Sequence, residues 1–178
     1  MTRDWNQASL AELVAHIVAV HHGLCREQLV RLAAELAAAA AETARQAPSL
    51  VRVTVGFQRL SRELTGHLAK EETVLFPLIE RIETARRNGT PPPVPSFGSI
   101  ANPIRMMILE HGEAERALEQ MRTASNGFQA PDGAGPRVQE LCRALQAFDA
   151  DLARHVELED KILFPRAVAM EREAAGSG

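Results

Sequence analysis

The sequence of 178 residues predicts an all-α protein, folded as an up-down antiparallel four-helix bundle. Ala and Leu dominate the composition, and aromatic residues make up only 4%, which favours helices over strands. Proline and glycine gather in short stretches that divide the chain into four long segments with helical periodicity. Two of these segments carry the same motif, so the bundle is predicted to contain an internal two-fold repeat of a helix pair.

The predicted helices follow from start and stop signals along the chain. Ser9 is a good N-cap, and Glu12 three residues later completes a capping box. Pro48 ends the first helix, and Asn88-Gly89 ends the second. The helices span about residues 9–47, 50–87, 102–125 and 136–174, with a proline-rich connector at 90–99, all in a single domain of residues 1–178.

Two prolines fall inside predicted helices. Pro77 and Pro165 lack the backbone N–H that an α-helix needs at interior positions, so each is expected to kink or end its helix locally.

Charge, hydropathy and cysteine content exclude several classes of protein. The formal net charge is -3 with no basic stripe, which argues against nucleic-acid binding. The apolar runs are too short to span a membrane, and no signal-peptide core is present, so a cytoplasmic protein is expected. Cys25 and Cys142 lie far apart in sequence and form neither a CxxC motif nor a disulfide framework. The sequence assigns neither cysteine a role.

The internal repeat has the form HxxxExxxLFP. One copy runs from His67 to Pro77 and the other from His155 to Pro165. A further histidine precedes each copy at nearly the same distance, His22 by 45 residues and His111 by 44. Each helix pair is therefore predicted to present one lone histidine and one His-xxx-Glu pair.

These polar residues share helix faces with apolar ones. Residues i and i+4 lie about 40° apart around an α-helix, so His67 and Glu71 fall on the stripe that includes Val74. By the same rule His155 and Glu159 share a stripe with Ile162, whereas Glu72, Glu157 and Asp160 point elsewhere. A buried carboxylate must be paired, protonated or bound to a metal, and no Lys or Arg lies on these stripes near the motifs. Two copies at matched spacing favour a metal.

The remaining candidates are weaker. His111 lies centrally on its apolar stripe, with Glu115 one turn further on near the edge. Glu115 is a candidate extra ligand or an acceptor for a histidine N–H, or else a carboxylate that reaches solvent. His21 and His22 both border the apolar face of the first helix. The pattern favours His22 and leaves His21 open, while His16 is expected on the surface.

The inward set contains imidazole and carboxylate donors without thiolate, which suits Fe, Mn or Zn. Because one zinc ion would need only three or four ligands, six donors from four helices fit a dinuclear site better. Two histidines on each ion and two bridging glutamates, with an oxo or hydroxo bridge, leave about one open position per ion. Such positions on a redox metal bind O₂, NO or peroxide.

Longer stretches of sequence carry a family resemblance. Three stretches accompany the two HxxxExxxLFP copies. They are HIVAVHHGLCREQLVRL within Trp5 to Leu32, then MILEHGEA, and then RTASNGFQAPDGAG, which is followed later by LARHVELEDKILFPRA. With this ordered set the chain resembles the haemerythrin-like HHE domain, and more narrowly the repair-of-iron-centres (RIC) di-iron family. The resemblance implies two non-haem iron ions, and it selects His22 over His21. The implied ligands are His22, His67, Glu71, His111, His155 and Glu159.

The resemblance also implies a function. It points to a protein of the nitrosative and oxidative stress response that repairs or protects iron–sulfur clusters, with NO, O₂ or peroxide reacting at iron. Damaged iron–sulfur proteins and an electron donor would then be its partners, and NO reduction, peroxide reaction and iron release stay open. The alternative is a reversible O₂ carrier or sensor of the haemerythrin type. It ranks lower because Glu115 stands where haemerythrins have a histidine.

Overall fold

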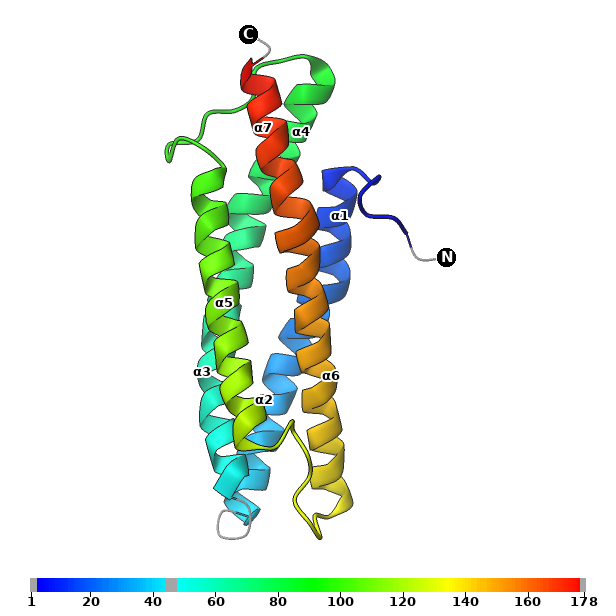
Figure 1. Cartoon of the computed structure of the whole chain (residues 1–178), viewed down its shortest axis with the longest axis vertical. Coiled ribbons are helices and arrows are strands. Elements are labelled where there is room, and N and C mark those ends of the chain that lie inside the picture. Colours follow the sequence, from blue (N-terminus) through cyan, green and yellow to red (C-terminus); the bar gives the residue numbers. More distant parts are fainter. Residues whose placement is uncertain (1–2, 44–47, 177–178) are drawn as a thin grey trace. The chain divides into compact units, whose positions relative to one another are not determined.

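The computed structural model describes residues 3–43 and 48–176, which form helices and loops only. Three short segments, labelled η, are π-helical. In chain order the elements are α1 (Leu10–His16), η1 (Ile17–His22), α2 (Gly23–Thr43), α3 (Pro48–Lys70), η2 (Glu71–Leu75), α4 (Phe76–Asn88), α5 (Ala101–Ala124), α6 (Pro136–Leu158), η3 (Glu159–Leu163) and α7 (Phe164–Gly176). They join into four long helical segments, which confirms the predicted all-α four-helix fold (Figure 1).

The start of the first helix follows its sequence signals. Ser9 caps α1, and its side chain accepts a hydrogen bond from the backbone N–H of Glu12. The Glu12 carboxylate accepts from the backbone N–H of Ser9, so the predicted capping box is present. The predicted helix extends to residue 47, but residues 44–47 lie outside the described part of the chain.

The helices continue through Pro77 and Pro165, but each contains a π-helical turn near its proline. A π turn, η2, comes immediately before Pro77, which lies in the first turn of α4 where no intrahelical N–H is required. η3 precedes Pro165 in the same way. The local disturbance that the sequence predicted therefore takes the form of a π turn.

The π turns also correct the predicted register of the apolar stripes. Val74 was expected on the buried face, but it is 47% exposed, whereas Leu75 is 1% exposed. In the second copy Ile162 is only half-buried, and Leu163 is fully buried. A π turn closes an i→i+5 hydrogen bond, so it holds one residue more than an α turn and shifts the stripe by one position.

The chain divides into two compact units. Unit 1 comprises Met1–His22, His67–Glu110 and Arg154–Gly178, and unit 2 comprises Gly23–Gly66 and His111–Ala153. Helices α3, α5 and α6 run from one unit into the other along the chain.

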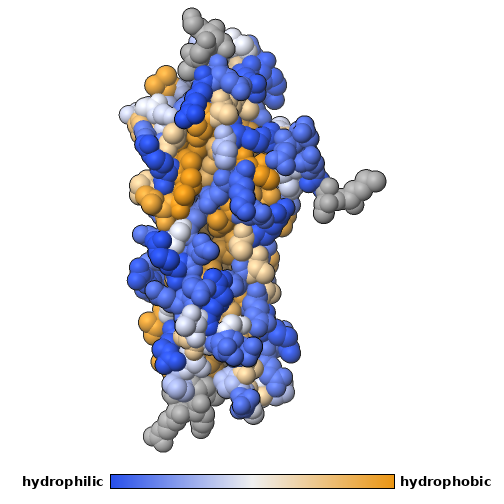
Figure 2. Space-filling view, viewed as in Figure 1, coloured by the Kyte–Doolittle hydropathy of each residue, from blue (hydrophilic) through white to orange (hydrophobic). Residues whose placement is uncertain are grey.

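Unit 1 has a core of aliphatic and phenylalanine side chains. In it α4 packs against α1 and α7, as Figure 1 shows for α4 and α7. The buried side chains come from α1, η1, η2, α4, the start of α5, and the helices around η3, and they include Leu10, Ile17, Phe76, Ile79, Ile104, Leu163 and Phe164. Figure 2 shows hydrophobic side chains over the start of α5 and over α7, and Met106, Ile108 and Leu109 of α5 are exposed.

Two glutamates in unit 1 cap the helices that carry the lone histidines. The Glu83 carboxylate accepts hydrogen bonds from the backbone N–H groups of Leu10 and Ala11, at 2.7 and 2.9 Å. Glu171 accepts from the backbone N–H of Ile100 at 2.9 Å, at the start of α5. Glu83 and Glu171 each stand twelve residues after the glutamate of their repeat, so the internal repeat extends to these caps.

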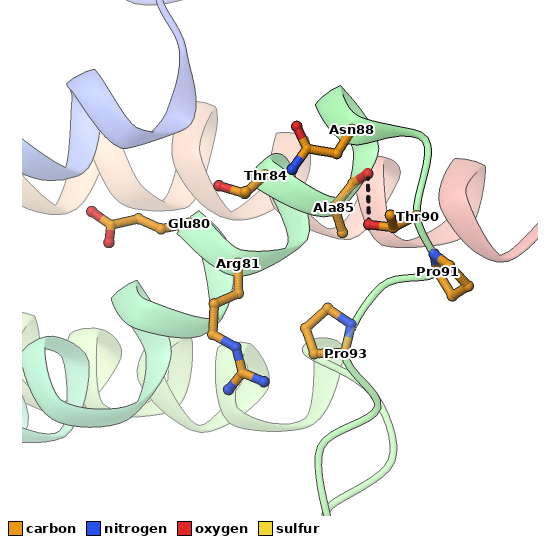
Figure 3. A pocket seen from close by; sticks show the side chains of 8 residues that line it. All are labelled: Glu80, Arg81, Thr84, Ala85, Asn88, Thr90, Pro91 and Pro93. Carbon is orange, nitrogen blue, oxygen red and sulfur yellow. Dashed lines mark hydrogen bonds between the residues drawn. The ribbon is translucent and has the colours of Figure 1, made fainter.

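The exit from α4 is set by a glycine. Gly89 adopts the left-handed conformation with φ 64, which ends the helix at Asn88. The Thr90 hydroxyl donates to the Ala85 carbonyl at 3.3 Å, and a shallow pocket of about 480 Å³ lies beside this turn, against Pro91 and Pro93 (Figure 3).

Unit 2 is held by its own contacts. The rings of Phe57 and Phe148 meet edge to face with centroids 5.4 Å apart. Arg122 pairs with Asp149 at 2.7 Å, linking α5 to α6. The Thr54 hydroxyl donates to the Leu50 carbonyl at 2.7 Å, which satisfies a buried polar group inside its own helix. Among the described residues no helix is both long and apolar enough to cross a membrane.

Candidate metal centre

Four buried donor side chains meet in unit 1. One ligand atom from each lies within 4.8 Å of all the others, and the residues are His22, Glu71, His155 and Glu159. His22 ends η1, Glu71 begins η2, His155 lies near the end of α6, and Glu159 begins η3. None of the four is more than 1% exposed. Three of them therefore stand at a π turn, a feature frequent at functional sites.

The distances within this donor cluster are those of groups converging on a common point. The Nε2 atoms of His22 and His155 are 3.1 Å apart, and the His155 Nε2 lies 3.0 Å from the Glu159 carboxylate. His22 Nε2 lies 3.5 Å from Glu71 and 3.7 Å from Glu159. His22 thus directs Nε2 toward both carboxylates, and His155 directs Nε2 toward Glu159.

His67 also contacts Glu71. Its Nε2 lies 3.4 Å from the Glu71 carboxylate, and ligand atoms of His67, Glu71 and Glu159 also lie within 4.8 Å of one another. Glu71 and Glu159 therefore belong to two groups of donors, a position suited to carboxylates that bridge two ions.

The sixth predicted donor, His111, is buried on α5. It follows Glu110 directly and is the first residue of this helix that belongs to unit 2. Glu115, one turn further along α5, is exposed to solvent. The sequence left several roles open for Glu115. The structure agrees with the one in which its carboxylate reaches solvent.

Glu71 provides the test of whether the cluster fits a metal. Its carboxylate is fully buried, and neither oxygen accepts a hydrogen bond within the described part of the chain. Burial, followed by the charge of Glu159, raises the pKa of Glu71 well above its usual range. Such a carboxylate is costly in an apolar interior unless a cation balances it. Nitrogen and carboxylate donors without thiolate suit divalent iron, manganese or zinc.

Two acidic residues outside the donor cluster orient its histidines. Glu72 accepts a hydrogen bond from Nδ1 of His22 at 2.7 Å, and Glu110 accepts from Nδ1 of His67 at 2.9 Å. With the proton on Nδ1, each ring directs the lone pair of Nε2 toward the cluster, the arrangement usual for metal-bound histidine.

Glu110 also forms an ion pair with Lys70. Burial alone would raise the pKa of Glu110, but the hydrogen bonds from Lys70 and His67 bring it below its usual value. Glu110 is therefore held as a carboxylate beside His67.

Sequence reasoning missed both of these acidic partners. It placed Glu72 about 140° away from His67 on an ideal α-helix. Glu72 instead reaches His22 on another helix, from inside the η2 π turn. Glu72 directly follows the repeat glutamate and Glu110 directly precedes His111, but this adjacency does not identify the distant histidine that each one contacts.

The choice between His21 and His22 has a structural explanation. Both residues lie in the η1 π turn and both are buried, at 5% and 0% exposure. His21 stacks on His155 with ring centroids 5.7 Å apart, whereas His22 directs Nε2 into the donor cluster. His21 thus packs against a member of the cluster.

His16 is half-buried, not the fully solvated residue that the sequence predicted. Its ring stacks on Trp5 with centroids 4.4 Å apart and meets His21 edge to face. Burial, and then the charges of Arg154 and Arg3, lower the pKa of His16.

The sequence of this chain is similar to those of known proteins. The model of the family described as the Hemerythrin HHE cation binding domain matches residues 13–167, a span that includes all six predicted donors. Similar relatives include the iron-sulfur cluster repair protein YtfE of Escherichia coli O81 (strain ED1a), of Escherichia coli O1:K1 and of Escherichia fergusonii. Each is 33% identical over 171 residues, which cover 95% of this chain and 71% of the relative.

Proposed function

Because the chain belongs to the haemerythrin HHE cation-binding domain family, we propose that it is a non-haem di-iron protein that repairs or protects iron–sulfur clusters. The similarity to iron-sulfur cluster repair proteins supports the cluster-repair role. The buried histidine and glutamate donors support iron binding.

In this proposal six residues hold two iron ions. His22 and His155 serve one ion, His67 and His111 serve the other, and Glu71 and Glu159 bridge them. Membership of Glu71 and Glu159 in two donor groups supports the bridging role. Burial of His111, next to a residue that contacts His67, supports its place as the sixth ligand.

Iron bound at this centre would supply one-electron chemistry and open positions for NO, O₂ or peroxide. The protein's own contribution is to orient the ligands and to keep bulk water away. Glu72 and Glu110 fix the imidazoles of His22 and His67. The surrounding core of unit 1 is aliphatic and aromatic, which lowers the local polarity. Damaged iron–sulfur proteins and an electron donor are the partners that this role requires.

One observation carries the proposal: the Glu71 carboxylate is fully buried and accepts no hydrogen bond from the described residues. The ionised form of a carboxylate in such a place needs a cation to balance it. Metal analysis of the purified, iron-reconstituted protein tests this directly. Two irons per chain are expected, with Glu71→Gln and His155→Ala losing iron and the exposed Glu115→Gln retaining it.

The function is tested on the same iron-loaded protein. Its ferrous form is expected to consume NO and to restore activity to a nitrosylated iron–sulfur protein, while Glu71→Gln does neither. Iron content below one ion per chain in the unaltered protein would refute the di-iron centre. A stable oxygen adduct without cluster restoration would instead support the O₂ carrier.

A further inference from the structure

A positively charged groove lies between α3 and α5 in unit 2. It has a volume of about 700 Å³, and four arginines and two glutamates line it, namely Arg52, Arg59, Arg62, Arg116, Glu63 and Glu113. None of the six predicted iron ligands lines it, and the groove does not depend on the proposed iron centre.

The charges in this α3–α5 groove are unbalanced. Arg59 pairs with Glu63 at 2.8 Å, so these two residues largely neutralise each other. Arg52, Arg62 and Arg116 form no hydrogen bond or ion pair with any residue that the structure describes. Only Glu113 remains to offset these three positive charges. The chain as a whole carries -3, so the local excess of arginine runs against the average charge of the protein.

Apolar and small residues also line the α3–α5 groove. A Cβ added to Gly56 would lie 2.9 Å from Cγ of Met121, so glycine at this position lets α5 approach α3 closely. Ala117 and Ala124 line the groove beside Met121, and Val55 at its edge is 64% exposed. The groove thus combines these apolar residues, the apolar strip, with guanidinium groups.

We propose that the α3–α5 groove binds an acidic, amphipathic segment of a partner protein. Arg52 and Arg62 stand ten residues apart on α3, a separation of about 15 Å along a helix. That length matches a segment of several residues and exceeds the reach of one phosphate or other small anion. Guanidinium groups pair with carboxylates through two parallel hydrogen bonds, and the apolar strip would take the segment's aliphatic side chains.

Glu63 and Glu113 argue against a nucleic acid as the occupant. A phosphate backbone would meet these carboxylates along the groove, and the net charge of -3 on the chain disfavours binding to a polyanion. A partner with both acidic and apolar side chains tolerates them better. Complementary charge would also speed the encounter.

The test measures binding of a fluorescein-labelled fourteen-residue peptide of Glu, Leu and Ala to the full chain, by fluorescence anisotropy at 0.15 M salt. The double variant Arg62→Gln/Arg116→Gln is expected to raise Kd at least tenfold. Val55→Asp, which adds a carboxylate at the edge of the groove, is expected to weaken binding as well. The matched control is Arg87→Gln/Arg172→Gln, which removes two exposed arginines outside the groove and should change Kd less than twofold.

Three outcomes would overturn the proposal: no saturable binding to the unaltered protein, equal weakening by the groove and control variants, or tighter binding of duplex DNA than of the peptide. Circular dichroism confirms that each variant is folded. Iron content is measured on the same samples, and unchanged iron with lost peptide binding separates this surface from the metal centre.

Discussion

At the scale of single residues, Glu72 orients the donor side chain of His22 without being a metal ligand itself. Its carboxylate holds the N–H of His22 Nδ1, which fixes the ring and leaves Nε2 to face Glu71 and Glu159. The negative charge also makes the imidazole a stronger electron donor to a bound cation. A change at Glu72 therefore acts on the metal through His22.

Glu72→Gln is expected to lower metal affinity by about tenfold, because partners of this kind typically contribute ten- to a hundredfold. Competition with a chelator under anaerobic conditions measures the effect. Glu115→Gln removes the same charge from an exposed position on α5 and should leave affinity unchanged. Equal loss in both variants would show that net charge, not the hydrogen bond to His22, sets the affinity.

The two cysteines are expected to be inert in the folded protein. Burial, and then the charge of Asp151, raises the pKa of the Cys25 thiol to about 12, and burial raises that of Cys142. At pH 8 a pKa of about 12 leaves about one Cys25 thiol in ten thousand as the reactive thiolate. Neither thiol should react with Ellman's reagent at that pH, and both should react in guanidinium chloride. Rapid reaction of the native protein would contradict the structure.

At the scale of elements, periodicity predicted the burial of the donor side chains but not the turns that follow the two glutamates. All six predicted donors are less than 5% exposed. For the four in the two HxxxE motifs, the spacing holds because the helix stays α-helical up to each glutamate. Beyond Glu71 and Glu159 the helix widens, and the stripe moves from Val74 to Leu75. A rule based on 100° per residue cannot anticipate this local change.

Contacts between helices were also out of reach of the sequence pattern. Glu83 lies more than 70 residues from the N–H groups it caps, and no local signal connects Glu110 to His67 across 43 residues. Such pairs depend on which helices become neighbours. By contrast, the capping box at Ser9 is local, and the sequence predicted it.

The cap at the start of α1 has a measurable effect on stability. Glu83→Ala leaves two N–H groups without an acceptor and removes a negative charge from the helix N-terminus, so a loss of about 1–2 kcal/mol is expected. Urea unfolding of the metal-free protein measures it. Glu80→Ala makes the same substitution at an exposed position of α4 and is expected to stay within about 0.5 kcal/mol of the unaltered protein.

At the scale of the whole molecule, the donor cluster that would bind the metal lowers the stability of the metal-free fold. A buried carboxylate with a raised pKa destabilises the metal-free fold, and a bound cation reverses this cost. Residues placed for function in this way often reduce the stability of the fold that carries them.

Glu71→Gln is therefore expected to leave the metal-free protein at least as stable as before, while abolishing the rise in Tm that iron produces in the unaltered protein. Differential scanning calorimetry with and without iron measures both quantities. A metal-free variant that melts well below the unaltered protein would mean that Glu71 supports the fold directly.

The π turns have a consequence for comparing and redesigning such chains. Each one accommodates an extra residue while the helix axis continues. A π turn is therefore the local structure that results when one residue is inserted into an α-helix. Excising Thr73 would remove that extra residue and let the turn close as an ordinary α turn, with the downstream residues still in phase with the part of the helix that carries His67. An alignment that ignores this offset would pair the wrong neighbours after each glutamate.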